Sequence, residues 1–188
     1  MTNPLPYQDT KPVGAADFYF AINATFRFIR ETLGVAALHA YWGDLGREYM
    51  GLVSQRWKQG GLPAVAEYWR AFFAAEPGAD VEVTITHGSS ESGISAAEAM
   101  PSHQVNRENA SLVVLNVKTC PAIRHLREGK RIIDPGFCQH CYYVSEAAAQ
   151  AAGLTVRIKG GNGSCRQIFC FSGAEESPQN MEDIEKAS

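Results

Sequence analysis

Cysteines are the residues of this chain whose type and spacing could do chemistry. All five lie between residues 120 and 170: Cys120, Cys138, Cys141, Cys165 and Cys170. Cys138 and Cys141 form a Cys-x-x-Cys pair, a spacing used both for metal ligation and for disulfide exchange. Disulfide exchange needs a thioredoxin-like strand–helix–strand setting, which the later strands do not provide, so metal ligation or nucleophilic chemistry is the stronger interpretation. A third interpretation is that the thiols are small buried side chains.

The Cys-x-x-Cys pair is predicted to lie at the start of a helix. Asp134 has the side chain of an N-cap residue, and Pro135 suits the first helical position. On that helix Cys138 and Cys141 share one face, whereas His140 points away from Cys138. Unpaired N–H groups and the helix dipole lower the pKa of a thiol in a first turn. We therefore expect Cys138 to be the most acidic thiol.

Cys120 and Cys165 are the candidates to complete a metal site with the pair. Cys120 follows one predicted strand and Cys165 opens another, so both can lie at the sheet rim near the start of the helix. Four thiolates suit zinc or, as the alternative, an iron–sulfur cluster. Three thiolates and an open position suit a catalytic metal. The predicted metal ligands are therefore Cys120, Cys138, Cys141 and Cys165, while strand alternation places Cys170 on the opposite face from Cys165.

Histidine and glutamate side chains outside the cysteine region are the candidates for a general base. His87 ends a predicted strand, Glu91 follows closely, and His103 lies in the long connection over residues 88–109. That connection is long enough to cover a site as a lid. His87, Glu91 or His103 could then take a proton from an attacking water. Together with the Cys-x-x-Cys pair they form the predicted catalytic set.

The N-terminal half is predicted to be helical. Apolar residues recur every three or four positions over residues 17–33, and a second periodic segment covers residues 35–57. Gly60-Gly61 is a break, after which a third helix is predicted over residues 63–75. Three glycines inside the second helix indicate close packing against another backbone or a ligand.

The C-terminal half changes to the alternation that is typical of strands. Predicted strands cover residues 81–86, 111–118, 154–159 and 166–171. The fold class is therefore α+β: N-terminal helices packed on a four-stranded antiparallel sheet, with a cysteine-bearing helix crossing between the two pairs of strands. One domain is expected over residues 15–173, between a flexible arm (1–14) and a disordered acidic tail (174–188).

Size, charge and composition exclude several classes of protein. A chain of 188 residues with 45% hydrophobic and 20% charged residues is typical of one globular domain. A net charge of −3, without a run of Lys or Arg, gives no electrostatic footprint for nucleic acid. No apolar run is long enough to span a membrane, and the first residues lack the features of a secretory signal. We expect a cytoplasmic protein with reduced thiols and a small-molecule substrate, and a homo-oligomer is left open.

Short motifs give the chain a resemblance to a known family. They are Thr119-Cys120-Pro121, Phe137-Cys138 at a helix start, and the run over residues 163–169 after a hairpin. With the glycine-bearing helix over residues 43–55, they resemble the L-2-amino-thiazoline-4-carboxylic acid hydrolase family. The resemblance covers about residues 30–172. More distantly the chain looks like the 4-vinyl reductase domain, a small-molecule-binding module.

The resemblance implies hydrolysis of a cyclic thiazoline at a carbon bonded to both sulfur and nitrogen. Cys141 departs from the family pattern, because it stands where an acidic residue is expected. In the related vinyl reductase modules cysteines and a glutamate can hold zinc, and Arg157 lies near where one of those ligands is expected. The expected function is a hydrolase or lyase that cleaves a C–S or C–N bond in a small sulfur-containing or heterocyclic substrate, with a metal at the cysteines. The alternative is a non-catalytic small-molecule-binding module with a structural zinc site.

Overall fold

A computed structural model describes the chain over residues 15–87, 110–172 and 178–188. Two predictions fall outside these ranges: the N-terminal arm, and the lid with Glu91 and His103. His87 is the last residue of a strand, and its side chain also lies outside the described part.

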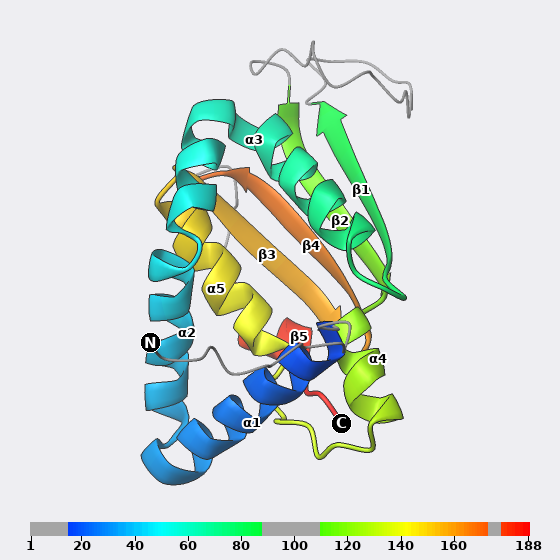
Figure 1. The fold of residues 1–188 in the computed structure, drawn as a ribbon. Helices are drawn as coiled ribbons and strands as arrows, with labels where there is room; N and C mark the ends of the chain where they lie inside the picture. The colour runs from blue at the N-terminus through cyan, green and yellow to red at the C-terminus, as the bar shows by residue number, and fades with distance from the viewer. Residues whose placement is uncertain (1–14, 88–109, 173–177) are drawn as a thin grey trace, which may run out of the picture.

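The described helices are α1 (Ala15–Leu33), α2 (Val35–Glu48), α3 (Gly51–Ala74), α4 (Pro121–Glu128) and α5 (Gln139–Gln150) (Figure 1). Gly34 separates α1 from α2 with a φ of 86°, a left-handed value that glycine adopts without steric cost. The break predicted at Gly60-Gly61 is a kink inside α3, where Gly61 has a φ of 62°. The predicted second helix is too long, because a turn at Tyr49 and Met50 separates α2 from α3.

The described strands are β1 (Asp80–His87), β2 (Ala110–Thr119), β3 (Leu154–Gly161), β4 (Ser164–Phe171) and β5 (Ile184–Glu185). They form one sheet in the order β1-β2-β4-β3-β5. The first four strands pair antiparallel, as predicted, but β5 pairs in parallel with β3 at Gly160 and Gly161. The sheet is therefore mixed and five-stranded, which corrects the predicted four-stranded antiparallel sheet.

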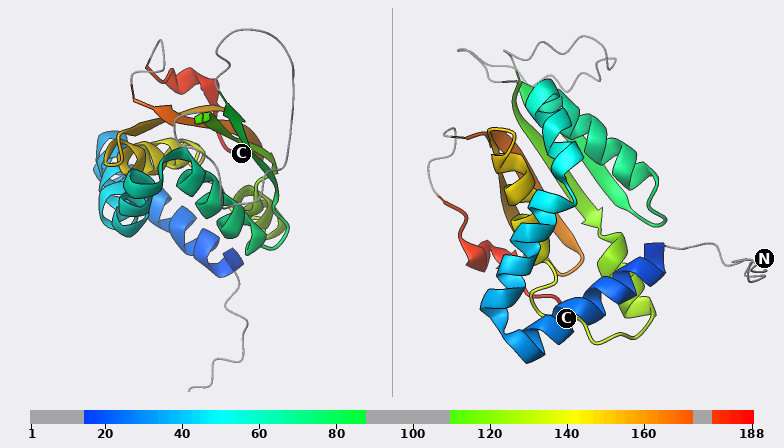
Figure 2. Two further views of the ribbon diagram at one scale, coloured as in Figure 1. Left: turned by 90° about the horizontal axis from the view of Figure 1, so that it is seen from above. Right: turned by 60° about the vertical axis from the view of Figure 1, so that its left-hand side comes forward.

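Helices α3 and α5 cover one face of this sheet, and α1 and α4 lie near one end of it (Figures 1 and 2). α3 and α5 pack on the strands, α2 packs on α5, and α1 contacts both α2 and α4. At Gly46 of α2, a Cβ atom would lie 2.5 Å from the carbonyl oxygen of Val144 in α5. The absence of a side chain at Gly46 therefore lets the two helix backbones approach closely, as predicted for one of the three glycines. A Cβ atom at Gly43 would meet only the Arg47 side chain, and one at Gly51 would meet nothing within 4 Å.

Two hydrophobic clusters lie beneath the helices. The first includes Trp57 and Phe169 and lies between α3, α5 and the sheet. The second includes Phe26 and Trp42 and lies between α1, α2, α4 and the start of α5. Cys138 packs against both clusters. The start of α5 is therefore the place where the two cores meet.

Helix α5 begins later than the sequence predicts, because Asp134 does not cap it. The buried carboxylate of Asp134 accepts two hydrogen bonds from Arg30, at 2.6 and 2.8 Å, and one from the Gly136 N–H at 2.8 Å. Residues 135–138 form turns, and Cys138 is the N-cap of α5. The buried ion pair thus uses the carboxylate that the sequence pattern assigns to a helix cap.

The tail predicted to be disordered from residue 174 is ordered over its described part, residues 178–188. This C-terminal segment contains a short 3-10 helix, η2 (Met181–Asp183), followed by β5. Ile184 is 3% exposed and packs in the first cluster, and Ala187 is 5% exposed and packs in the second. These two apolar residues anchor a segment whose acidic composition indicates disorder.

Candidate functional site

The four predicted metal ligands come from α4, α5 and β4. Cys120 is the N-cap of α4, Cys138 is the N-cap of α5, Cys141 lies in the first turn of α5, and Cys165 lies on β4. All four are half-buried. They lie near enough that a thiolate at Cys141 raises the pKa of each of the other three. These four residues are the cysteine cluster.

Three sulfurs of the cysteine cluster accept hydrogen bonds from N–H groups. Cys138 Sγ accepts the backbone N–H of Asn162 at 3.2 Å, and Cys165 Sγ accepts the side-chain amide of Gln167 at 3.6 Å. Backbone N–H groups at the start of α4 hydrogen-bond Cys120 and act to lower its pKa. Such bonds stabilise a thiolate, and they are also the outer support that a metal-bound thiolate requires.

Burial nevertheless raises the pKa of every thiol in the cluster. Loss of hydration, aided by repulsion between thiolates, raises the pKa of Cys120 to about 11 and that of Cys138 and Cys165 to about 12. Burial raises the pKa of Cys141 to about 12. The expectation that Cys138 is the most acidic thiol is therefore wrong, because desolvation outweighs the hydrogen bond at the start of α5.

The cysteine cluster has donor atoms of the right type for zinc or an iron–sulfur cluster. In residues 15–87, 110–172 and 178–188, no three His, Cys, Asp or Glu side chains are placed to hold a metal ion, so zinc or an iron–sulfur cluster would require the thiols to rearrange. Both cofactors therefore stay proposals based on the type and proximity of the thiols, and no chemical step is assigned to them.

The predicted base His87 lies far from the cysteine cluster. Its backbone pairs with Ala110 at the start of β2, whereas Cys120 follows the end of that strand. At about 3.3 Å per residue along a strand, the two positions are separated by about 30 Å. His87 and the cysteine cluster are therefore not one site. Glu91 and His103 lie outside the described residues.

His140 lies next to the cluster, although the helical periodicity directs it away from Cys138. Its Nε2 atom is 3.8 Å from Cys141 Sγ, and its Nδ1 atom lies against the carbonyl oxygen of Phe137. Burial lowers the pKa of His140, which favours the neutral ring. Since a carbonyl oxygen only accepts, Nδ1 carries the proton and Nε2 is the proton acceptor.

Tyr19 is a second neighbour of the cluster that the sequence did not reveal. Its hydroxyl donates to Glu76 Oε2 at 2.9 Å, which joins α1 to the end of α3. Burial and the hydrogen bond to Glu76 raise the pKa of Tyr19, and the charges of Cys120 and Cys141 add to this effect. In the sequence Tyr19 belongs to an apolar helical stripe, which is typical of a core residue.

A row of side chains extends from the cluster along the inner face of β4. Cys165, Gln167 and Phe169 follow one another at steps of about 7 Å. Gln167 is 5% exposed, and its Oε1 has no hydrogen-bond partner in the described part of the chain. Trp57 and Trp69 lie against Phe169, with ring centroids 5.6 and 6.1 Å away, and their buried Nε1–H groups also lack described partners.

Unpartnered polar atoms of this kind are costly. A buried donor or acceptor without a hydrogen bond destabilises a fold by about 1–3 kcal/mol, so such groups call for a functional explanation. The sequence signal was available: alternation along β4 places the polar Gln167 on the buried face between Cys165 and Phe169. It was missed because the tryptophans of α3 have the spacing of core residues.

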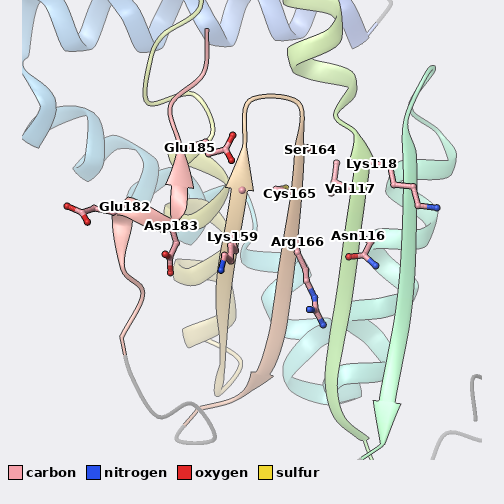
Figure 3. A pocket seen from close by; sticks show the side chains of 11 residues that line it. Asn116, Val117, Lys118, Lys159, Ser164, Cys165, Arg166, Glu182, Asp183 and Glu185 are labelled. Atoms are coloured by element: carbon pink, nitrogen blue, oxygen red, sulfur yellow. The ribbon is translucent and has the colours of Figure 1, made fainter. Parts of the chain in front are cut away.

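The outer face of the sheet carries a separate open hollow of about 580 Å³ (Figure 3). Asn116, Lys159 and Arg166 line it from β2, β3 and β4, and Asp183 lines it from the C-terminal segment. Cys165 also lines the hollow, although its side chain packs against the first hydrophobic cluster on the other face. The sheet therefore lies between this charged hollow and the cysteine cluster.

None of the described helices is long and apolar enough to cross a membrane. No family model, curated protein or solved structure matches the chain. The cysteine cluster and its buried neighbours are therefore the basis for assigning a function.

Proposed function

We propose that the chain binds a small, largely apolar molecule between α3 and the sheet, and acts on it at the cysteine cluster. The observation that carries this proposal is the unpartnered amide oxygen of Gln167, which lies beside Cys165. The unpartnered N–H groups of Trp57 and Trp69 lie further along the same face. An acceptor and two donors among aromatic rings suit a ring-shaped ligand that carries both kinds of hydrogen-bonding group.

The proposed reaction is hydrolytic or eliminative cleavage of a C–S or C–N bond in a small sulfur-containing or heterocyclic substrate. This is the chemistry of the thiazoline hydrolases that the cysteine motifs resemble. In the hydrolytic form, water attacks the carbon bonded to sulfur and nitrogen while a base takes one of its protons. The carbon–sulfur bond then breaks and the sulfur leaves with that proton, while the second proton of the water passes to the nitrogen as the carbonyl group forms.

His140 is the proposed base. Its Nε2 atom is the acceptor of a neutral ring and lies 3.8 Å from Cys141 Sγ, at the edge of the cluster. It can take the proton from water and return it to the leaving sulfur. Thiols with pKa values of about 11 to 12 stay protonated at neutral pH, so Cys120 and Cys138 can donate S–H hydrogen bonds to the substrate.

A non-catalytic small-molecule-binding module with a structural zinc site is the second candidate. The N–H donors on Cys120, Cys138 and Cys165 favour it, because they are the support that zinc-bound thiolates use. The two candidates share the ligand site beside Gln167. They differ in whether a bound molecule is turned over.

Replacing Gln167 by leucine tests the ligand site. Leucine removes an unpartnered buried acceptor at the cost of the long 3.6 Å hydrogen bond from the Gln167 amide to Cys165 Sγ, so Gln167→Leu should raise the free energy of unfolding by at most about 1 kcal/mol. The same change should weaken ligand binding by about tenfold, the effect of one lost hydrogen bond. The probes are 2-amino-thiazoline-4-carboxylate and, as aromatic rings without a ring sulfur, phenol and indole. Binding is read from quenching of tryptophan fluorescence.

Gln150→Leu is the matched control, because Gln150 is exposed on α5, where its side-chain amide donates to Glu146 at 3.0 Å. Failure of every probe to bind, or equal binding by Gln167→Leu, would contradict the ligand site. Release of a thiol from 2-amino-thiazoline-4-carboxylate, lost in His140→Gln while binding persists, supports the enzyme. Binding without any release of thiol supports the module.

A further inference from the structure

Asn162 and Gly163 form the two-residue loop between β3 and β4. Their φ angles of 50° and 119° are positive, as tight hairpin loops with the sequence Asn-Gly require. This loop contacts two thiol-bearing residues at once. The N–H of Asn162 donates to Cys138 Sγ at 3.2 Å, and the carbonyl of Gly163 accepts the N–H of Cys120 at 2.8 Å.

The side chain of Asn162 connects the same loop to α4 and to the C-terminal segment. Its Oδ1 accepts hydrogen bonds from Arg127 Nη2 at 2.5 Å and from the Ser188 N–H at 3.0 Å, and its Nδ2 lies 3.2 Å from Ser188 Oγ. Arg127 closes the network, since its Nε and Nη2 donate to the Ser188 carbonyl at 3.1 and 3.0 Å. Asn162 is therefore the common partner of a cysteine, an arginine and the C-terminal segment.

The C-terminal segment also contacts the other side of Cys138. The N–H of Ala187 donates to the carbonyl of Pro135 at 3.1 Å, in the turn that precedes Cys138. β5 lies along β3, so close that a Cβ atom on Gly161 would meet the carbonyl oxygen of Glu185 at 2.7 Å. The C-terminal segment thus contacts both the β3–β4 loop and the turn that precedes Cys138.

We infer that Asn162 is a positioning residue for Cys138. Its side chain also limits access to the Cys138 sulfur, because it hydrogen-bonds the C-terminal segment in place beside the cysteine cluster. The backbone of Asn162 places an N–H group on the sulfur, and its side chain fixes that backbone to Ser188 and Arg127. This inference rests on the proposal that the cluster is the reactive end of the ligand site. It adds a residue and a segment that control access to the sulfur.

Two substitutions at Asn162 distinguish the role of its side chain from that of the loop backbone. Asn162→Gly keeps the left-handed loop and its N–H group but removes the side chain. Asn162→Asp keeps an oxygen that can accept from Arg127 and Ser188. The measurement is the rate at which iodoacetamide modifies Cys138 at one fixed pH, followed by mass spectrometry and divided by the rate at Cys170. Asn180→Gly, which removes the side-chain cap of η2 in the same segment, is the control.

Asn162→Gly should raise the Cys138-to-Cys170 rate ratio by about tenfold, the factor that corresponds to about 1.4 kcal/mol of lost hydrogen bonding. Asn162→Asp and Asn180→Gly should leave the ratio near that of the original chain. An unchanged ratio in Asn162→Gly would overturn the inference, and so would an equal rise in all three variants. Because no ligand takes part, the result is independent of whether the proposed function is right.

Discussion

A thiol at a helix start is acidic only where the surroundings stabilise its charge. Cys141 lies in the first turn of α5, yet burial raises its pKa to about 12. Cys138 receives an N–H hydrogen bond from outside the helix, and its pKa is still raised to about 12. The position of a cysteine along a helix can be read from sequence, whereas its hydration depends on the cores that close around it.

The raised thiol pKa values predict a loss of stability at alkaline pH. The ordinary thiol pKa is 9.0, and the folded value for Cys165 is about 12. Above about pH 9 the unfolded chain loses thiol protons that the folded chain retains, so the free energy of unfolding falls as pH rises. Below about pH 9 the thiols are protonated in both states, so this loss of stability is absent. Urea unfolding of the metal-free protein at pH 8 and pH 10 measures the effect.

Cys165→Ala is the control for this pH dependence, since Tyr19 acts in the same direction at higher pH. Because the Cys165→Ala variant lacks one thiol with a raised pKa, its free energy of unfolding should fall less steeply between pH 8 and pH 10. Equal slopes in the two proteins would show that burial does not hold the Cys165 pKa above its ordinary value.

At the scale of elements, the start of α5 depends on a buried ion pair. Arg30 in α1 makes two hydrogen bonds to Asp134, at 2.6 and 2.8 Å, and the Asp134 side chain is 0% exposed. Arg30→Met should lower the free energy of unfolding by about 3 kcal/mol, because it leaves a buried carboxylate without its charged partner. Urea denaturation checks this value.

Arg27→Gln is the matched control on the same helix. Arg27 pairs with Glu31 at 3.4 Å on the surface, and exposed pairs of this spacing contribute only about 0.3–0.5 kcal/mol. Comparable losses in Arg27→Gln and Arg30→Met would mean that the ion pair with Asp134 does not hold the turn before α5.

The C-terminal segment provides a second prediction at this scale. Ile184 is 3% exposed, so Ile184→Ala should lower the free energy of unfolding by about 2–4 kcal/mol, the cost of removing a buried branched side chain. Lys186→Ala, at an exposed position of the same segment, should change it by less than about 0.5 kcal/mol. Similar small effects at both positions would indicate that the segment does not pack on the sheet.

The same elements show what the sequence could predict. Helix α1 and the alternating strands β1 to β4 lie close to where their patterns indicate, because each pattern depends on one locally buried face. The segment over residues 35–57 is helical as predicted, but it is divided between α2 and α3. β5 was not predicted, since Ile184 and Ala187 are isolated apolar residues in an acidic tail and gain their burial from distant parts of the chain. The start of α5 was misplaced for a similar reason: Arg30, 104 residues away, takes the carboxylate of Asp134.

For the whole molecule, the cysteine cluster lies at the junction between the two hydrophobic cores. Cys120 packs on the second core, Cys165 on the first, and Cys138 on both. The sequence predicted these thiols as one group because each is placed at the end of an element. Alternation along β4 places Gln167 on the same face as Cys165, so its position could be predicted. The sequence could not predict that Tyr19 joins them, because that side chain belongs to an apolar helical stripe that indicates core packing.

Metal uptake tests whether this junction can be cross-linked. Zinc added to the protein without oxygen should bind at about one ion per chain if the four thiols rearrange around it. Because such an ion would connect both cores, it should raise the free energy of unfolding by about 2.7 kcal/mol at a hundredfold excess over its Kd. Elemental analysis and thermal unfolding measure the two effects.

Cys138→Ser and Cys165→Ser should each lower zinc occupancy sharply. Cys170→Ser should not, since strand alternation along β4 places Cys170 on the opposite face from Cys165. Full occupancy in the first two variants, or no zinc uptake by the original chain, would contradict a metal site and leave the thiols to act through their hydrogen bonds alone.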